Sequence, residues 1–199
     1  MLKINSLKNE IPLPIRLFLG RALLFYIVWE IIYGLFIYDS TFIDRALTSH
    51  VGESSVSILN NMSPMSGFTA NNKLYTAKTL DGEDVAVFHT AISHNNRKIL
   101  NIANVCNGLT LMALYIGFIV CIPEKFWRKI KYIILGIIII DFINILRCVG
   151  LIYLREYFHA YFDFAHHYLF KAIVYASTFI IWTIFARKIN LKHDTLQNG

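Results

Sequence analysis

Four long apolar runs dominate the pattern of hydrophobic and polar positions along the chain. A helix needs roughly 20 residues to cross the hydrocarbon core of a bilayer. We therefore expect membrane-spanning helices at about residues 17–38, 99–122, 132–154 and 164–186. The first run is too long for the apolar part of a secretory signal and lacks a small-x-small cleavage pattern after it, so we interpret it as a retained helix. The pattern predicts an all-α integral membrane protein with a single membrane domain over residues 1–199.

The segment between the first two runs, residues 39–98, is more polar and has regular patterns of its own. Residues 41–62 have the apolar spacing of an amphipathic helix. Residues 73–90 alternate on either side of Asp81–Gly82, a dipeptide favoured in tight hairpin turns. We expect a small extracytoplasmic segment that includes a β-hairpin, and its simplest interpretation is a cap without chemistry of its own.

Composition and charge favour a membrane as the solvent of this chain. The sequence is 56% hydrophobic and 16% charged, which is too apolar for a soluble domain of this size. The net charge of +6 alone is compatible with nucleic-acid binding, but the basic residues lie mainly beside the apolar runs, where they face lipid headgroups. By the positive-inside rule, both termini are cytoplasmic and the segment 39–98 is outside. We expect a multi-pass protein of the plasma (inner) membrane that contacts lipids and no nucleic acid.

Several polar residues lie inside the predicted membrane helices, where ionisable groups are costly and usually face a bundle interior or a wet cavity. Asp141, Asn144 and Arg147 follow one another at a spacing that puts them on one helix face. A structural alternative is that Arg147 pairs with Asp141 or extends to the headgroups. Glu30 lies within the first run, and we expect it to face the bundle, toward Arg147 or Lys171. Its role stays open.

The predicted topology brings three reactive groups to a similar depth below the outer surface. Cys106 and Arg147 are each expected roughly 10 Å below it, at 1.5 Å per helical residue. His166 and His167 are near the outer end of the fourth helix. A thiolate is stabilised beside a cation, and a cysteine with a histidine base is an activated nucleophile for acyl transfer. Arg147 suits stabilisation of the thiolate or an oxyanion, and Asp163 is placed four residues before His167 to orient its ring.

Two plainer interpretations of the cysteine stay open. A single cysteine in a helix is usually a small packing residue. A disulfide between Cys106 and Cys148 in the oxidising outer compartment is a further structural alternative.

The motifs around these residues resemble those of the exosortase/archaeosortase family, integral-membrane cysteine transpeptidases that process proteins with a C-terminal sorting tail. "VCNGLT" is similar to the family's cysteine followed by a small or polar residue and glycine, and "NILR" is similar to its Asn-x-x-Arg. "AHHYLF" is similar to its histidine at the start of the last helix. The resemblance covers roughly residues 95–185 and corresponds to a compact form, because many members have about eight membrane helices.

The resemblance implies roles for individual residues. Cys106 would be the nucleophile and Arg147 would stabilise the oxyanion or thiolate. We prefer His167 as the acid/base because its offset to Phe170 is similar to the family's pattern and because it pairs with Asp163. His166 is a close alternative, and the supporting residues are Asn144, Asp141 and Asp163.

The implied function is a membrane-embedded cysteine transpeptidase or protease without a cofactor, acting through a thioester on the outer side of the membrane. Its partners would be exported proteins with a C-terminal hydrophobic sorting tail, and the acceptor group is not specified by the sequence. One alternative is a non-catalytic membrane scaffold. Another is a zinc-dependent membrane protease that uses His89, His94 and the His166–His167 pair as ligands, although no H-E-x-x-H sequence occurs.

Overall fold

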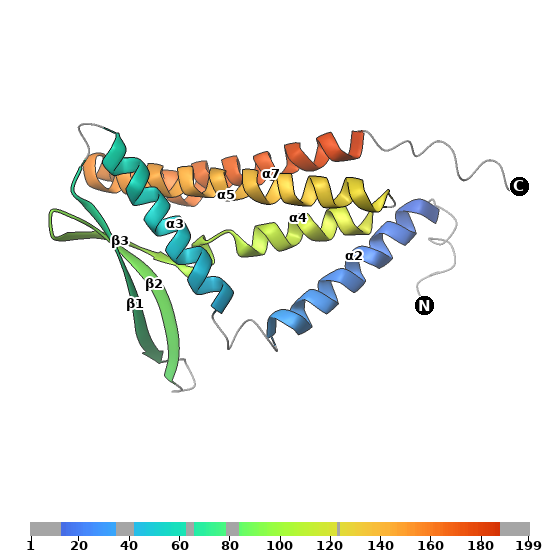
Figure 1. Ribbon diagram of the computed structural model, residues 1–199, viewed down its shortest axis with the longest axis horizontal. Helices are drawn as coiled ribbons and strands as arrows, with labels where there is room; N and C mark the ends of the chain where they lie inside the picture. Colours follow the sequence, from blue (N-terminus) through green and yellow to red (C-terminus); the bar gives the residue numbers. More distant parts are fainter. Residues whose placement is uncertain (1–12, 35–41, 63–65, 79–83, 123, 188–199) are drawn as a thin grey trace, which may run out of the picture.

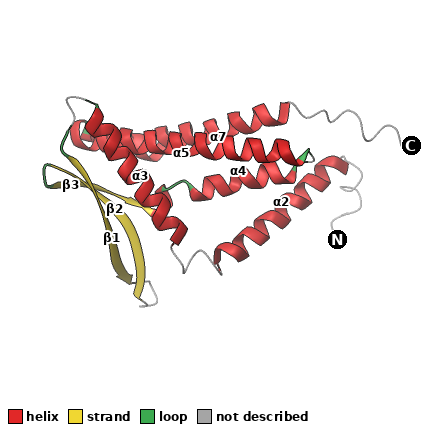
Figure 2. Cartoon of the chain, viewed as in Figure 1, coloured by secondary structure: helices red, strands yellow, loops and turns green. Residues whose placement is uncertain are grey.

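A bundle of long helices and a smaller cap of one helix and three strands make up the fold (Figure 1). The computed structural model describes residues 13–34, 42–62, 66–78, 84–122 and 124–187. The three strands lie at one end of the bundle, and α3 (Phe42–Asn61) lies between them and the long helix α5 (Phe126–Tyr157) (Figure 2). Most of the described chain is helical, as expected, and the expected hairpin belongs to a sheet that has one strand more than the sequence predicts.

The bundle is organised around two long helical stretches that run side by side. Its elements are α2 (Leu13–Ile32), α4 (Leu109–Cys121), α5 (Phe126–Tyr157), α6 (His159–Phe164), the π-helical turn η3 (Ala165–Leu169) and α7 (Phe170–Arg187). Phe158 alone separates α5 from α6, so the chain reverses direction sharply there and α7 returns along α5 (Figure 1). With 32 residues, α5 is about 48 Å long at 1.5 Å per residue. It is longer than a bilayer core and extends from the bundle to the cap.

Two stretches among the described residues are long and apolar enough to cross a membrane, namely Phe126–Tyr157 and His159–Ala186. They correspond to the predicted third and fourth helices. Helix α4 is apolar but has only 13 residues, and α2 carries Arg16, Arg21 and Glu30 within its 20. The count of four membrane spans and their orientation stay predictions.

The cap contains the elements that the polar segment predicts, and one more. Helix α3 (Phe42–Asn61) is the amphipathic helix, and β1 (Phe68–Lys78) pairs antiparallel with β2 (Asp84–His94). The pairing of Lys78 with Asp84 confirms the hairpin, while the expected turn at Asp81–Gly82 lies outside the described residues. A third strand, β3 (Arg97–Ala103), completes a sheet of order β1-β2-β3.

The start of the predicted helix 99–122 is wrong. Residues 99–103 belong to β3, the 3₁₀ turn η2 spans Asn104–Cys106, and α4 begins only at Leu109. An apolar run has the same composition in a buried strand and in a buried helix, so periodicity alone does not separate them. Gly108 has a φ of 85°, in the left-handed region that glycine tolerates, and it interrupts the helix. The depth of Cys106, counted along a continuous helix, is corrected in the same way.

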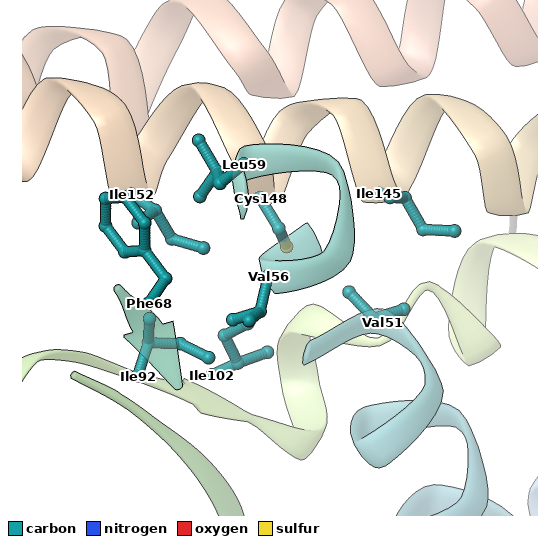
Figure 3. Packing of buried hydrophobic residues seen from close by; sticks show 9 residues of the cluster. All are labelled: Val51, Val56, Leu59, Phe68, Ile92, Ile102, Ile145, Cys148 and Ile152. Atoms are coloured by element: carbon teal, nitrogen blue, oxygen red, sulfur yellow. The ribbon is translucent and has the colours of Figure 1, made fainter. Parts of the chain in front are cut away.

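Two apolar clusters hold the two regions together, and α5 contributes to both. The cap cluster joins α3, the sheet and the C-terminal half of α5 (Figure 3). Its buried members are Val51, Val56, Leu59, Phe68, Ile92, Ile102, Ile145, Cys148 and Ile152. The bundle cluster joins α4, α5 and α7, with Tyr115, Ile119, Ile140 and Phe185 at its centre. The turn η2 and the start of α4 lie between the two.

Candidate active site at the junction of bundle and cap

Cys106 ends the turn η2, which connects the last strand of the cap to the bundle helix α4. Two side chains of α5 donate hydrogen bonds to its backbone carbonyl oxygen. Asn144 Nδ2 lies 3.1 Å from this oxygen and Arg147 Nη2 lies 3.4 Å from it. The spacing of the two donors along α5 puts both on one helix face, as the sequence predicts. The nucleophile candidate is thereby held against α5 through its backbone, while its side chain stays partly exposed.

The turn that carries Cys106 is also held by the cap helix α3. Asn107 is 2% exposed, and its Nδ2 donates to Asp44 Oδ1 at 2.6 Å. Its Oδ1 accepts a hydrogen bond from the backbone N–H of Leu109 at 2.9 Å, which satisfies a free donor at the start of α4. Thr48 Oγ1 donates to Asn104 Oδ1 at 3.1 Å. The cap therefore determines the backbone path on both sides of the cysteine.

Gly108 permits a close approach between this turn and α5. Besides its positive φ, a Cβ at this position would lie 3.4 Å from Asn144 Nδ2. Another residue would strain the backbone because of the positive φ, while its Cβ would be in ordinary contact with the amide that bonds to Cys106. The Asn107–Gly108 pair is thus a turn signal with a structural reason.

Two cavities meet at Cys106. The first, which we call the helix cavity, has a volume of about 420 Å³ and lies between α4, α5 and α7. The second, the strand cavity, has a volume of about 160 Å³ and lies between β3, α5 and α6. Cys106, Arg147 and His166 line both cavities. A thiol, a guanidinium and an imidazole from three different elements therefore meet around shared space.

The structure brings His166, and not the preferred His167, to this place. His167 is exposed and lines neither cavity, although its ring lies edge-on to that of His166 with centroids 4.9 Å apart. The two histidines lie in the π-helical turn η3, which holds one residue more per hydrogen-bonded turn than an α-helix. Spacing counted for an α-helix therefore misjudges which side chain points inward. Asp163 is exposed, and within the described part of the chain no hydrogen bond or ion pair joins it to His167.

Asp141 faces the cap instead of the cavities. Its Oδ2 lies 3.0 Å from Nε2 of His50 on α3. Asn144 Oδ1 and Arg147 Nε are buried and have no hydrogen-bond partner among the described residues. Both atoms belong to side chains that line the helix cavity. Glu30, which was expected to face the bundle, is exposed on α2.

All three cysteines are free thiols. Cys148 is buried in the cap cluster and lines the strand cavity together with Cys106, so the two are neighbours without a bond. The disulfide alternative does not describe this structure. Cys121 is buried at the far end of α4.

The geometry gives no support to a zinc site. Among the described residues, no group of three or more His, Cys, Asp or Glu side chains is placed to hold a metal ion. His94 lies 3.0 Å from Glu156 Oε1 and stacks on Phe68, while His89 is buried in the sheet.

Sequence reasoning missed part of the site. Lys171 and Tyr175 of α7 line the helix cavity, and Asp44 positions the turn through Asn107. Asn107 lies next to the cysteine, and the Asn107–Gly108 pair is a sequence signal for a turn that could have identified it. Nothing in the sequence pairs Asp44 with it, because 62 residues separate the two along the chain.

Comparison with known families gives one match. The sequence model described as transmembrane exosortase matches residues 15–184, a range that includes the cap, both cavities and nearly all of the bundle. No curated protein and no solved structure matches the chain. The family match and the two long apolar helices together support a location in a membrane. They also confirm the resemblance noted in the sequence: the chain belongs to the transmembrane exosortase family.

Proposed function

We propose that this protein is a cysteine transpeptidase or peptidase that cleaves C-terminal sorting signals of exported proteins on the outer side of the plasma membrane. One observation carries the proposal: Cys106, Arg147 and His166 line the same two cavities although they come from separate elements. The family match supports a membrane-bound enzyme of this general kind. The topology expected from the basic flanks supports the outer side.

The first chemical step is attack by the cysteine. His166 accepts the thiol proton of Cys106, and the thiolate sulfur forms a bond to the scissile carbonyl carbon. The carbonyl oxygen becomes an oxyanion. Arg147 is the adjacent permanent cation, and in a cavity with little water a fixed charge stabilises developing negative charge strongly.

The second step releases the tail and the third releases the product. The carbonyl C–N bond breaks as protonated His166 gives its proton to the departing amine, which leaves a thioester on Cys106. An incoming amine or water then attacks the thioester carbonyl and loses a proton to His166. The sulfur of Cys106 leaves as His166 returns this proton to it, which restores the thiol. An amine acceptor gives transpeptidation and water gives hydrolysis.

The helix cavity suits the hydrophobic tail of such a substrate. Leu111 and Leu114 of α4 and Val174 of α7 contribute apolar wall, and Lys171 lies on the same helix as Val174. A membrane-spanning tail would keep its apolar surface in lipid or against these helices while its scissile bond reaches Cys106. This arrangement accounts for catalytic groups on membrane helices in a small chain.

Replacement of the nucleophile tests the proposal. The substrate is a co-encoded exported protein with a C-terminal hydrophobic tail, and tail cleavage is followed by mass shift in cells. We expect Cys106→Ala to abolish cleavage. The matched control is Cys121→Ala, which removes a buried thiol at the far end of α4 that lines neither cavity and leaves cleavage in place.

Other outcomes of this experiment would support one of the two alternative functions. Cleavage that persists in Cys106→Ala and stops with a chelator would favour a metal-dependent protease. Cleavage that neither treatment changes would favour a scaffold that acts without its own chemistry.

A further inference from the structure

Three consecutive residues of β3 line the strand cavity, and this pattern shows where the cavity lies relative to the sheet. They are Leu100, Asn101 and Ile102. Successive side chains of a strand point to opposite faces of the sheet. A hollow on one face would therefore meet only alternate residues. Because all three line it, the strand cavity runs along the edge of β3.

This edge is not paired with another strand. Within the part of the chain that the structure describes, β3 is the last strand of the sheet and pairs only with β2. About half of its backbone N–H and C=O groups point away from β2, as they do in any edge strand. Among the described residues, no backbone hydrogen bond outside the sheet involves residues 97–103. Such an edge can accept an extended peptide as an added strand.

The edge leads directly to the candidate nucleophile. β3 ends at Ala103, and Cys106 follows at the end of the next turn. Cys106, Arg147 and His166 line the strand cavity as well as the helix cavity. The opposite wall of the strand cavity includes the apolar side chains Leu151 and Phe162. A peptide lying along β3 would thus pass the three groups that carry the proposed chemistry.

We propose that the edge of β3 binds the substrate segment on the acyl side of the scissile bond, in an extended conformation, by strand addition. This inference rests on the proposed function and names how its substrate is held. The hydrophobic tail follows the scissile bond in the chain, so it occupies the helix cavity between α4 and α7. The residues before the bond then extend from Cys106 in the other direction, along β3 and toward the cap.

Site-directed cross-linking tests the direction and the conformation. The protein carries Cys106→Ala, which keeps the substrate uncleaved, together with Asn101→Cys on the exposed part of β3. The probe is the co-encoded tailed protein with single cysteines introduced one at a time before its tail. We expect disulfides with Asn101→Cys at alternate probe positions, because an added strand has a period of two residues. The matched control is Leu74→Cys, an exposed position on the other edge strand β1.

A second pair of variants tests the same edge in the intact enzyme. Asn101→Trp fills the strand cavity, and we expect cleavage to fall by about tenfold or more because a displaced scissile bond reacts poorly. Leu74→Trp adds the same bulk to β1 and leaves cleavage unchanged. Thermal unfolding in detergent checks that both variants fold.

The outcomes separate this inference from the proposed function. If cleavage needs Cys106 but the probe cross-links no better to Asn101→Cys than to Leu74→Cys, strand addition is overturned. The assignment as a cysteine enzyme is then unaffected. Cross-links at every probe position would also overturn it. Cleavage that continues unchanged in Cys106→Ala overturns the proposed function. The strand inference is then overturned too, because it rests on that function.

Discussion

The bundle and the cap are held together by different forces. The bundle interior is mostly apolar: the buried Thr178 bonds to the carbonyl of Val174 on its own helix, and the buried Tyr115 hydroxyl donates to the carbonyl of Tyr132 on α5. The cap buries polar side chains of α3 and the sheet, among them Thr48 and Thr90, whose hydroxyls bond across elements. Lipid gives little hydrophobic drive for helix association, so packing dominates there. Specific polar contacts are concentrated in the cap.

The candidate site uses this difference. α5 and η3 supply Arg147 and His166 from a rigid apolar frame, while α3 adjusts the turn of Cys106 through directional hydrogen bonds. The reactive groups thus come from the bundle, and the backbone that presents the thiol is set by the cap. Substitutions on the two sides should therefore have different consequences.

The largest effect is expected on the bundle side. His166→Ala removes the proposed acid/base and should lower the rate of tail cleavage about 10²- to 10⁴-fold. The matched variant His167→Ala changes an exposed neighbour and should lower the rate much less. The measurement is the cleavage rate as a function of pH, because loss of the base also removes one limb of the profile. Equal losses in both variants would contradict the choice of His166.

A smaller effect is expected where the cap meets the turn. Asn107→Asp puts two carboxylates in place of the amide–carboxylate bond to Asp44, and a buried pair without its hydrogen bond costs about 1–3 kcal/mol. We expect lower stability in detergent and slower cleavage. The double variant Asp44→Asn/Asn107→Asp restores a donor and an acceptor in exchanged positions and keeps the acceptor for Leu109. If the double variant cleaves no faster than Asn107→Asp alone, the contact does not position the site.

The smallest effect belongs to the cap alone and depends on pH. Burial lowers the pKa of His89, and Lys98 and Lys73 lower it further. In the unfolded chain this ring takes up a proton as the pH falls through about 6.5, while in the folded cap it does so only at lower pH. The unfolded state then binds more protons, so the cap loses stability as the pH falls.

Hydrogen exchange of β2 and β3 amides between neutral and mildly acidic pH measures this effect. His89→Gln should reduce the slope of stability with pH, while amides of α4 serve as the internal reference in the bundle. An unchanged slope in His89→Gln would assign the pH dependence to another group.

Long, regular patterns were the predictable part of the fold. The apolar runs of α5 and α7 and the spacing of α3 each extend over several turns, so chance similarity is small. The hairpin of β1 and β2 follows from alternation around a turn dipeptide. These elements need little tertiary information.

The unpredictable part lies around Cys106. Leu100 and Ile102 are apolar because they face the strand cavity or the cap core, and only residues 104–108 separate their strand from the equally apolar α4. The Asn107–Gly108 pair is a turn signal, but the sequence does not show that Gly108 has a positive φ and that α4 therefore begins only at Leu109. The sequence did not indicate that His166 lines the cavities for a related reason, because a π-helical turn has no clear composition.

Phe158 has a consequence for how this chain tolerates changes in length. It is the single residue between α5 and α6, so Arg147 and His166 lie on opposite arms of a helical hairpin whose connection is one residue long. One residue added or removed between these arms would turn the second by about 100° and carry His166 away from both cavities. The number of residues between Arg147 and His166 is therefore fixed by the geometry of the site.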